Sequence, residues 1–123
     1  MNHPEENMQI ALFQWAHIQQ TSIPELKYLF HVPNGGKRGI KEATRLKAAG
    51  VKRGVPDVVL PVPRGGYHGL FVELKAGKNR PTPEQTAWLT ELGRNGYRTA
   101  VCYALDDAIR EIKMYLNLRG ETA

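Results

Sequence analysis

Two hydrophobic segments set the fold, Val55-Pro56-Asp57-Val58-Val59-Leu60 and Leu70-Phe71-Val72-Glu73-Leu74-Lys75. Each contains an apolar run, which is typical of a buried strand, and each carries charge at one end. Gly65-Gly66 lies midway between Asp57 and Glu73. A hairpin that turns at these glycines would place the two acids side by side, at the end away from the turn.

Lys75 is expected to join the two acids, because residues two apart on a strand share one face. Mg²⁺ prefers oxygen ligands and keeps several waters, so one or two carboxylates suffice to hold it. Asp57 and Glu73 are therefore candidate ligands for Mg²⁺ or Mn²⁺, and the Leu74 carbonyl is a third candidate.

A metal ion held there would lower the pKa of a bound water and neutralise charge on a phosphate oxygen. Lys75 would orient the attacking water or offset the charge of the transition state. The pattern favours phosphodiester hydrolysis over acyl transfer, because no nucleophile accompanies it. The alternative is a solvated ion pair on a strand face, with no chemistry.

The composition indicates a soluble globular protein with a basic surface. The chain has 123 residues, of which 41% are hydrophobic and 24% charged, which suits one domain over residues 1–123. A formal net charge of +5 favours a polyanionic partner. The single cysteine, Cys102, excludes an internal disulfide and a multi-cysteine zinc site. No stretch suits a signal peptide or a membrane span, so we expect a cytoplasmic protein without a membrane partner.

Helical and strand patterns alternate along the rest of the chain. The expected elements are a helix from Pro4 to Gln19, a strand from Tyr28 to Val32, a basic helix from Ile40 to Ala49, a strand that Asp57 begins, a return strand to Lys75, a helix opened by Thr82-Pro83-Glu84-Gln85, a strand from Arg98 to Tyr103 and a last helix. This order predicts an α/β fold in which helices flank a central mixed sheet.

Several details of these elements are also predicted. Thr82 and Gln85 form the pattern of a capping box, and Asp106 is expected to cap the last helix. Trp88, with Leu89 and Leu92, is expected to form the buried face of its helix. Phe13 and Ile18 fall outside the main apolar face of the first helix, which suggests a second buried face, against a partner subunit.

The residues of the expected site resemble a known nuclease signature. Pro56-Asp57 with Glu73-Leu74-Lys75 is similar to the PD-(D/E)XK signature, and five ordered blocks narrow the resemblance to the VRR-NUC family. The blocks are His31-Val32-Pro33-Asn34-Gly35-Gly36, Leu46-Lys47-Ala48-Ala49-Gly50-Val51, Gly54-Val55-Pro56-Asp57, Phe71-Val72-Glu73-Leu74-Lys75, and Gln85 with Trp88. The resemblance covers roughly residues 5–103 and implies a restriction-endonuclease-like core and metal-dependent DNA cleavage.

The resemblance also implies roles for individual residues. It makes Asp57, Glu73 and the Leu74 backbone the metal ligands, and Lys75 the catalytic lysine. Gln85 matches a glutamine thought to face the site, and closing the capping box is a compatible alternative.

The family further places an acidic residue on the first helix. Glu5 and Glu6 both qualify, and Glu5 is favoured because it shares a helix face with Gln9. Stabilising the helix N-terminus is the alternative role for both acids.

Stand-alone members of the family, from phages and bacteria, resemble Holliday-junction resolvases and pair as dimers. The short chain is similar to these, and a C₂ dimer would supply the two matched incisions that a four-way junction needs. We therefore expect a homodimeric, structure-selective DNA endonuclease acting on branched DNA in a bacterial or phage-infected cell. The alternatives are a nuclease for flap, nicked or plain duplex DNA, and a non-catalytic DNA-binding module.

Basic residues are concentrated on the segments beside the expected site, where they would pair with phosphates. Arg53 and Lys52 are the best candidates because they precede the Asp57 strand. Asn34 lies in a tight turn that could present backbone amides to a phosphate. His31 is not expected to be a metal ligand, because hard cations prefer oxygen. It is expected to contact the site or to pack in its strand. The other basic candidates are Lys37, Arg38, Lys41, Arg45, Lys47, Lys78 and Arg80. A scattered solvated surface is the alternative.

Overall fold

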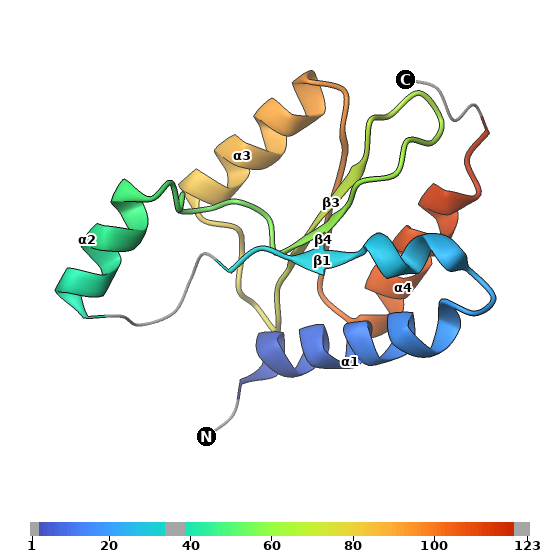
Figure 1. Ribbon diagram of the computed structural model, residues 1–123, viewed down its shortest axis with the longest axis horizontal. Coiled ribbons are helices and arrows are strands. Elements are labelled where there is room, and N and C mark those ends of the chain that lie inside the picture. Colours follow the sequence, from blue (N-terminus) through green and yellow to red (C-terminus); the bar gives the residue numbers. More distant parts are fainter. Residues whose placement is uncertain (1–2, 34–38, 120–123) are drawn as a thin grey trace.

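The computed structural model describes residues 3–33 and 39–119 (Figure 1). Its elements are α1 (Pro4–Gln19), the 3₁₀ helix η1 (Pro24–Tyr28), β1 (Phe30–His31), α2 (Ile40–Ala48), β2 (Val58–Leu60), β3 (Leu70–Leu74), α3 (Pro83–Arg94), β4 (Arg98–Cys102) and α4 (Leu105–Leu116). The predicted order of helices and strands is confirmed, with η1 as an addition. In the part of the chain described, no helix is long and apolar enough to cross a membrane.

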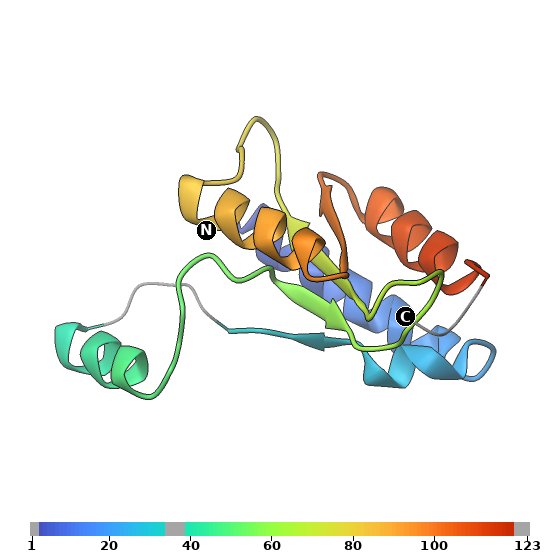
Figure 2. The same ribbon diagram turned by 90° about the horizontal axis from the view of Figure 1, so that it is seen from above.

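The four strands form one mixed sheet in the order β1-β2-β3-β4. β2 is antiparallel to both β1 and β3, whereas β3 and β4 are parallel. The parallel pair needs a crossover connection, which α3 supplies. Helices α1 and α4 pack on one face of the sheet and α3 on the other (Figures 1 and 2). The predicted α/β architecture, a mixed sheet flanked by helices, is confirmed.

Gly65 and Gly66 form the tip of the β2–β3 hairpin. Arg64 and Tyr67 pair across it, with N–H to carbonyl distances of 2.8 and 3.1 Å. The φ angles of the glycines are +57° and +84°. Two successive residues with left-handed backbone conformation match a type I′ turn, whose twist suits the flanking strands. Glycine adopts this conformation at little cost because it has no Cβ. The turn is therefore where the sequence predicts it.

The main hydrophobic core lies between the sheet and the α1–α4 pair. Leu12 and Ala16 of α1 are buried, as the helical spacing predicts, and Tyr115 of α4 donates a hydrogen bond to the Val62 carbonyl. The alternation of side chains along the strands sends one set of residues into this core. These strand residues are Val58, Leu60, Leu70, Val72 and Leu74.

The opposite face of the sheet is covered less completely. No residue of α3 is fully buried, and Trp88, Leu89 and Leu92 are only half-buried. The prediction of a buried face on this helix therefore holds only in part. Phe71 and Tyr97 cover some of the face with an edge-to-face contact between rings 5.2 Å apart.

Two local predictions were wrong at the level of single residues. Tyr28 belongs to η1 and β1 is shorter than predicted, because Pro24 starts a helical turn that continues to Tyr28. Asp106 does not cap α4: the N-cap is Ala104, which makes no side-chain capping bond. Asp106 lies instead in the first turn, where its negative charge interacts favourably with the positive end of the helix dipole.

Replacing the buried Ile112 should destabilise the fold. Ile112→Ala should lower the free energy of unfolding by about 2–5 kcal/mol, because it leaves a cavity under the sheet. Met114→Ala on the same helix is the matched control, since Met114 is 56% exposed and should change the value by less than about 0.5 kcal/mol. Urea denaturation measures both, and equal losses in the two variants would contradict the assigned core.

Candidate active site

The structure brings Asp57, Glu73 and Lys75 together at one end of the sheet. The β2–β3 register pairs Val58 with Val72, so the preceding Asp57 lies opposite Glu73. Lys75 follows β3 and stays in register with β4, since its N–H donates to the Cys102 carbonyl at 2.9 Å. Its Nζ lies 3.7 Å from Glu73 Oε2. Alternation places these charged side chains on the α3 side, away from the main core.

Asp57 is held by both neighbouring strands. Its Oδ2 accepts a hydrogen bond from the Leu74 N–H at 2.8 Å. Its carbonyl accepts from the Val32 N–H at 2.9 Å and lies 2.8 Å from His31 Nδ1. A carbonyl only accepts, so Nδ1 of His31 carries the proton. His31 therefore contacts the site through the Asp57 backbone.

Glu73 is a buried acid whose bonding is incomplete. It is 2% exposed, and Oε1 has no hydrogen-bond partner within the described ranges. The pKa of Glu73 is raised from 4.5 to about 8, mostly by burial and further by the neighbouring Asp57, while Lys75 opposes the shift. Two adjacent carboxylates in such a place need either a shared proton or a cation between them.

The residues present suit a hard cation. Within residues 3–33 and 39–119, no group of three or more His, Cys, Asp and Glu side chains could hold a metal ion. Zinc sites usually draw three or four ligands from such side chains. Mg²⁺ and Mn²⁺ accept fewer protein ligands and fill the remaining positions with water. Asp57, Glu73 and the Leu74 carbonyl, the predicted ligand set, could hold such an ion, and the unpartnered Glu73 oxygen fits this use.

The first turn of α1 reaches the same end of the sheet. Glu5 Oε2 accepts from the Ala76 N–H at 3.2 Å and from Asn79 Nδ2 at 3.1 Å. The charge of Glu5 also contributes to the raised pKa of Glu73. Glu6 is more exposed, although both acids line a cavity of about 310 Å³ together with Asn79. Of the two acids, the structure thus brings Glu5 to the site.

Gln85 closes the predicted capping box. Its backbone N–H donates to Thr82 Oγ1 at 3.2 Å, and its Oε1 accepts from the Thr82 N–H at 2.9 Å. The side-chain oxygen is therefore engaged in capping α3.

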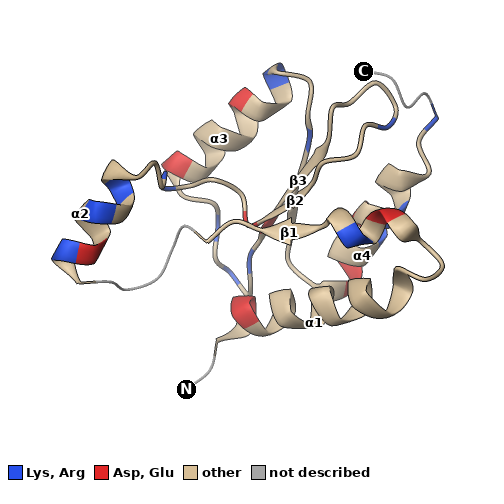
Figure 3. Cartoon of the chain, viewed as in Figure 1, with Lys and Arg blue, Asp and Glu red and all other residues tan. Residues whose placement is uncertain are grey.

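The predicted DNA-contacting residues fall into two groups. Asn34, Lys37 and Arg38 lie outside the described residues. The others have exposed side chains on α2 and on the loops around the site (Figure 3). They are Lys41, Arg45, Lys47, Lys52, Arg53, Lys78 and Arg80.

Sequence reasoning missed how the loop before β2 is fixed. Trp88 Nε1 donates to the Arg53 carbonyl at 3.0 Å. Gly54 has a φ of +89°, and a Cβ there would lie 2.8 Å from the carbonyl carbon of Glu84. The glycine lets the loop press against the first turn of α3, three residues before Asp57. The signal available was the glycine itself, inside the Gly54-Val55-Pro56-Asp57 block.

Comparisons with known proteins identify the family to which the chain belongs. The family model described as the VRR-NUC domain matches residues 3–106. A solved structure described as a VRR_NUC domain protein is 31% identical in sequence, covers 97% of this chain and 93% of its own, and superposes with a TM-score of 0.82. Curated proteins provide no match. Since the family model spans most of the chain and the structural likeness nearly all of it, the chain belongs to the VRR-NUC family of nucleases, which has the PD-(D/E)XK fold.

Proposed function

We propose that the protein is a metal-dependent, structure-selective DNA endonuclease that hydrolyses phosphodiester bonds in branched DNA such as Holliday junctions. The observation that supports this proposal is the buried acid Glu73, which lies with Asp57 and Lys75 at one end of the sheet. One oxygen of Glu73 has no hydrogen-bond partner among the described residues. Membership in a nuclease family supports the reaction class.

Mg²⁺ or Mn²⁺ is the proposed cofactor, held by Asp57, Glu73 and the Leu74 carbonyl. Bound there, the ion supplies a water of lowered pKa and positive charge beside the scissile phosphate. The protein prepares the ligands: the Leu74 N–H orients the Asp57 carboxylate, and burial keeps Glu73 within the site. As a ligand, Glu73 would be deprotonated, because ligating carboxylates carry no proton.

Lys75 is the proposed catalytic lysine. It is 8% exposed, so its charge is poorly screened by water and acts strongly on nearby groups. The amine would donate to the attacking water or to a phosphate oxygen and would stabilise the negative charge of the transition state. Glu73, 3.7 Å away, keeps the amine directed at the metal end.

Glu5 and Gln85 are proposed as supporting members of the site. Glu5 ties the turn after β3 to α1 through Ala76 and Asn79, and its carboxylate lies near enough to influence Glu73. Gln85 holds the first turn of α3 beside the loop that carries Asp57. Both would keep the reacting groups in a fixed geometry.

The proposed DNA contacts are phosphate contacts. Lys52 and Arg53 precede Asp57 on an exposed loop, while Lys47 and Lys78 flank the site on either side in sequence. Asn34, Lys37 and Arg38 complete the proposed set. Contacts of this kind position DNA without reading its sequence, which suits recognition by shape.

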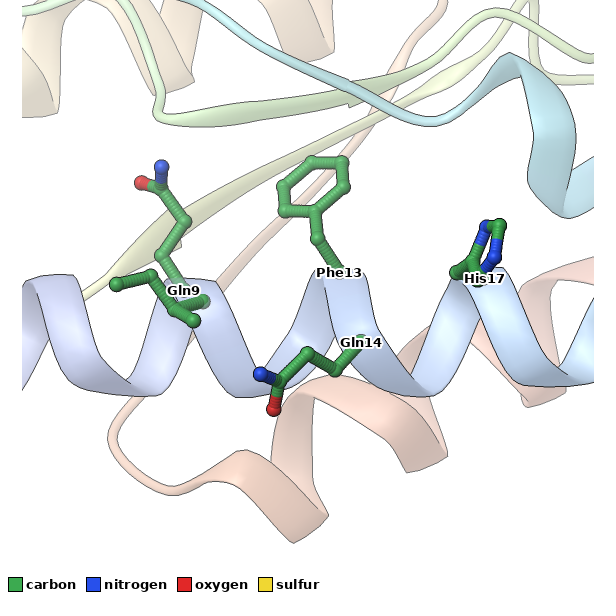
Figure 4. A pocket seen from close by; sticks show the side chains of 5 residues that line it. Gln9, Phe13, Gln14 and His17 are labelled. Atoms are coloured by element: carbon green, nitrogen blue, oxygen red, sulfur yellow. The ribbon is translucent and has the colours of Figure 1, made fainter.

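We further propose that the protein acts as a homodimer that uses the outer face of α1. A groove of about 450 Å³ runs along this face, and Figure 4 shows Gln9, Phe13, Gln14 and His17 around it. Ile10, which also lines the groove, is 50% exposed, and Ile18 on the same helix is 67% exposed. Exposed apolar side chains gathered on one helix favour a protein partner. Two copies related by a two-fold axis would match the symmetry of a four-way junction.

Removing a metal ligand or the lysine should abolish cleavage without abolishing DNA binding. Asp57→Asn and Lys75→Ala should each slow single-turnover cleavage by at least on the order of 100-fold. DNA affinity, measured by fluorescence anisotropy, should stay within a few-fold of wild type, because the basic residues remain. Asp106→Asn, an exposed acid in the first turn of α4, is the control and should cut normally. Wild-type cleavage by Asp57→Asn would exclude this metal site.

Metal binding should strengthen with pH because of Glu73. The pKa of Glu73 is about 8 in the metal-free fold, against 4.5 for the ordinary acid, and the charged groups that act on it are Asp57, Lys75 and Glu5. The raised pKa stabilises the metal-free fold fully below pH 4.5, and this stabilisation is lost as the pH rises through about 8. A bound cation takes the place of the proton, so Mn²⁺ should bind more tightly at high pH.

The melting temperature measures this effect. At a Mn²⁺ concentration about 100 times its Kd, stabilisation reaches about 2.7 kcal/mol. At one fixed Mn²⁺ concentration, the rise in melting temperature should be larger near pH 8 than near pH 6. Glu73→Gln should remove most of this difference, while Glu91→Gln, an exposed control, should keep it. A rise independent of pH in the wild type would contradict the assignment of Glu73.

A strand-resolved cleavage map tests the substrate. With Mg²⁺ or Mn²⁺, a synthetic four-way junction should receive two symmetric incisions and should be cut faster than flap, nicked or plain duplex DNA of the same sequence. The mass of the protein in solution should be that of a dimer. Preferential cutting of flap or plain duplex DNA would transfer the proposal to those substrates, and a monomer would remove the symmetry argument.

A further inference from the structure

Helix α2 stands apart from the body of the molecule. None of its residues is buried, and the ribbon views show it extending away from the sheet and from the other helices (Figures 1 and 2). Ile40 is 86% exposed, and Leu46 is only half-buried. A helix of nine residues gains little stability alone in water. The exposure of α2 therefore suggests that a binding partner, and not the rest of the chain, covers this helix.

One face of α2 is basic and otherwise small. Lys41, Thr44, Arg45 and Ala48 recur at i, i+3, i+4 and i+7, so they form one stripe along the helix. Each of the four is exposed, and Figure 3 shows the basic positions on the helix. Small side chains between two cations would let the helix approach a flat, charged surface closely.

The base of α2 is connected to the proposed active site by a short loop that is anchored to α3. Gly50, with a φ of +105°, ends the helix, and the Val51 N–H donates to the Leu46 carbonyl at 2.9 Å. This bond and its neighbour from Gly50 form a Schellman motif, which sets the direction in which the chain leaves the helix. The loop that follows is attached to α3 by the Trp88–Arg53 hydrogen bond and then leads directly to Asp57. The position of α2 relative to the metal end is thus set at its root.

We propose that α2 is a DNA-binding arm, whose Lys41 and Arg45 contact backbone phosphates of the duplex beyond the scissile phosphate. The inference rests on the proposed function and deepens it by assigning a surface that holds an arm of the branched substrate. DNA is favoured over a second copy of the chain as the occupant of this stripe, because the stripe is cationic and complements phosphates, whereas a second copy also carries a net charge of +5.

The size of the helix fits this role. At about 1.5 Å per residue the nine residues extend about 13 Å, which covers about four phosphate steps of one strand. Lys41 and Arg45 are one turn apart, so both can reach one strand. Since neither side chain belongs to the acid pair, α2 acts on binding and leaves the chemical step unchanged.

The test compares two double variants with the same change in charge. Lys41→Gln/Arg45→Gln removes the cations of the stripe. Lys113→Gln/Arg119→Gln, on and just after α4 and thus away from α2, is the control. Neither pair of side chains is buried, so both variants should fold, which circular dichroism and melting temperature verify. The probe is a synthetic four-way junction in Ca²⁺, with long arms or with arms trimmed to the region next to the branch.

The α2 variant should bind the long-armed junction on the order of tenfold more weakly than wild type, and the salt slope of log Kd should fall by about two. Trimming the arms of the junction should lower the DNA affinity of the wild type but should change the affinity of the α2 variant little. The cleavage rate at saturating DNA in Mg²⁺ should be that of wild type for both variants. The control should leave affinity, slope and rate unchanged.

Two results would overturn the inference. The first is an α2 variant whose affinity and salt slope match those of the control. The second is a variant that loses its dimeric mass in light scattering with no change in salt slope, since α2 would then contact a second copy. Either result leaves the proposed function intact, because wild-type cleavage is measured in the same series. If wild type neither binds nor cuts any of the DNA substrates, it is the proposed function that fails.

Discussion

The antiparallel register between β2 and β3 is the constraint on which the site depends. It places Asp57 opposite Glu73, where the neighbouring Asp57 raises the pKa of Glu73 and so disfavours its charged form. The glycine turn fixes this register at one end, and the Leu74 N–H bond to Asp57 fixes it at the other. A shift by one residue would send one acid into the apolar core. The fold therefore stabilises an arrangement that the acids alone would oppose.

The two faces of the sheet are covered unequally, and the proposed metal site lies on the side that the helices cover less. The α1–α4 side holds the hydrophobic core and supplies most of the rigidity. On the α3 side no helix residue is fully buried, and the sheet ends where Lys75 and Glu5 meet the turn after β3. The proposed metal site lies at this edge. Its ligands are anchored by packed strands, because Asp57 precedes β2 and Glu73 belongs to β3.

The sequence predicted the features that depend on local chemistry. The hairpin, its register and the Thr82–Gln85 capping box follow from residues close in the chain, and all three are present. Contacts between distant segments were not accessible, because no local pattern encodes them. The bonds of Glu5 to Asn79 and of His31 to the Asp57 carbonyl are of this kind. The sequence predicted α2 as a helix, but it could not tell that none of the residues of this helix would be buried.

Holding a rigid duplex and cleaving it place opposite demands on the protein. The acid pair needs burial and fixed neighbours, since the pKa of Glu73 depends on low exposure and on Asp57. Phosphates along a duplex need exposed cations spread over a length greater than the sheet end provides. In the proposed mechanism these demands are met by different parts of the chain. The β2–β3 hairpin carries the catalytic groups, and α2 contacts phosphates farther along the duplex. The loop around Gly54 joins them, and its contact with α3 keeps the two parts in a constant relation.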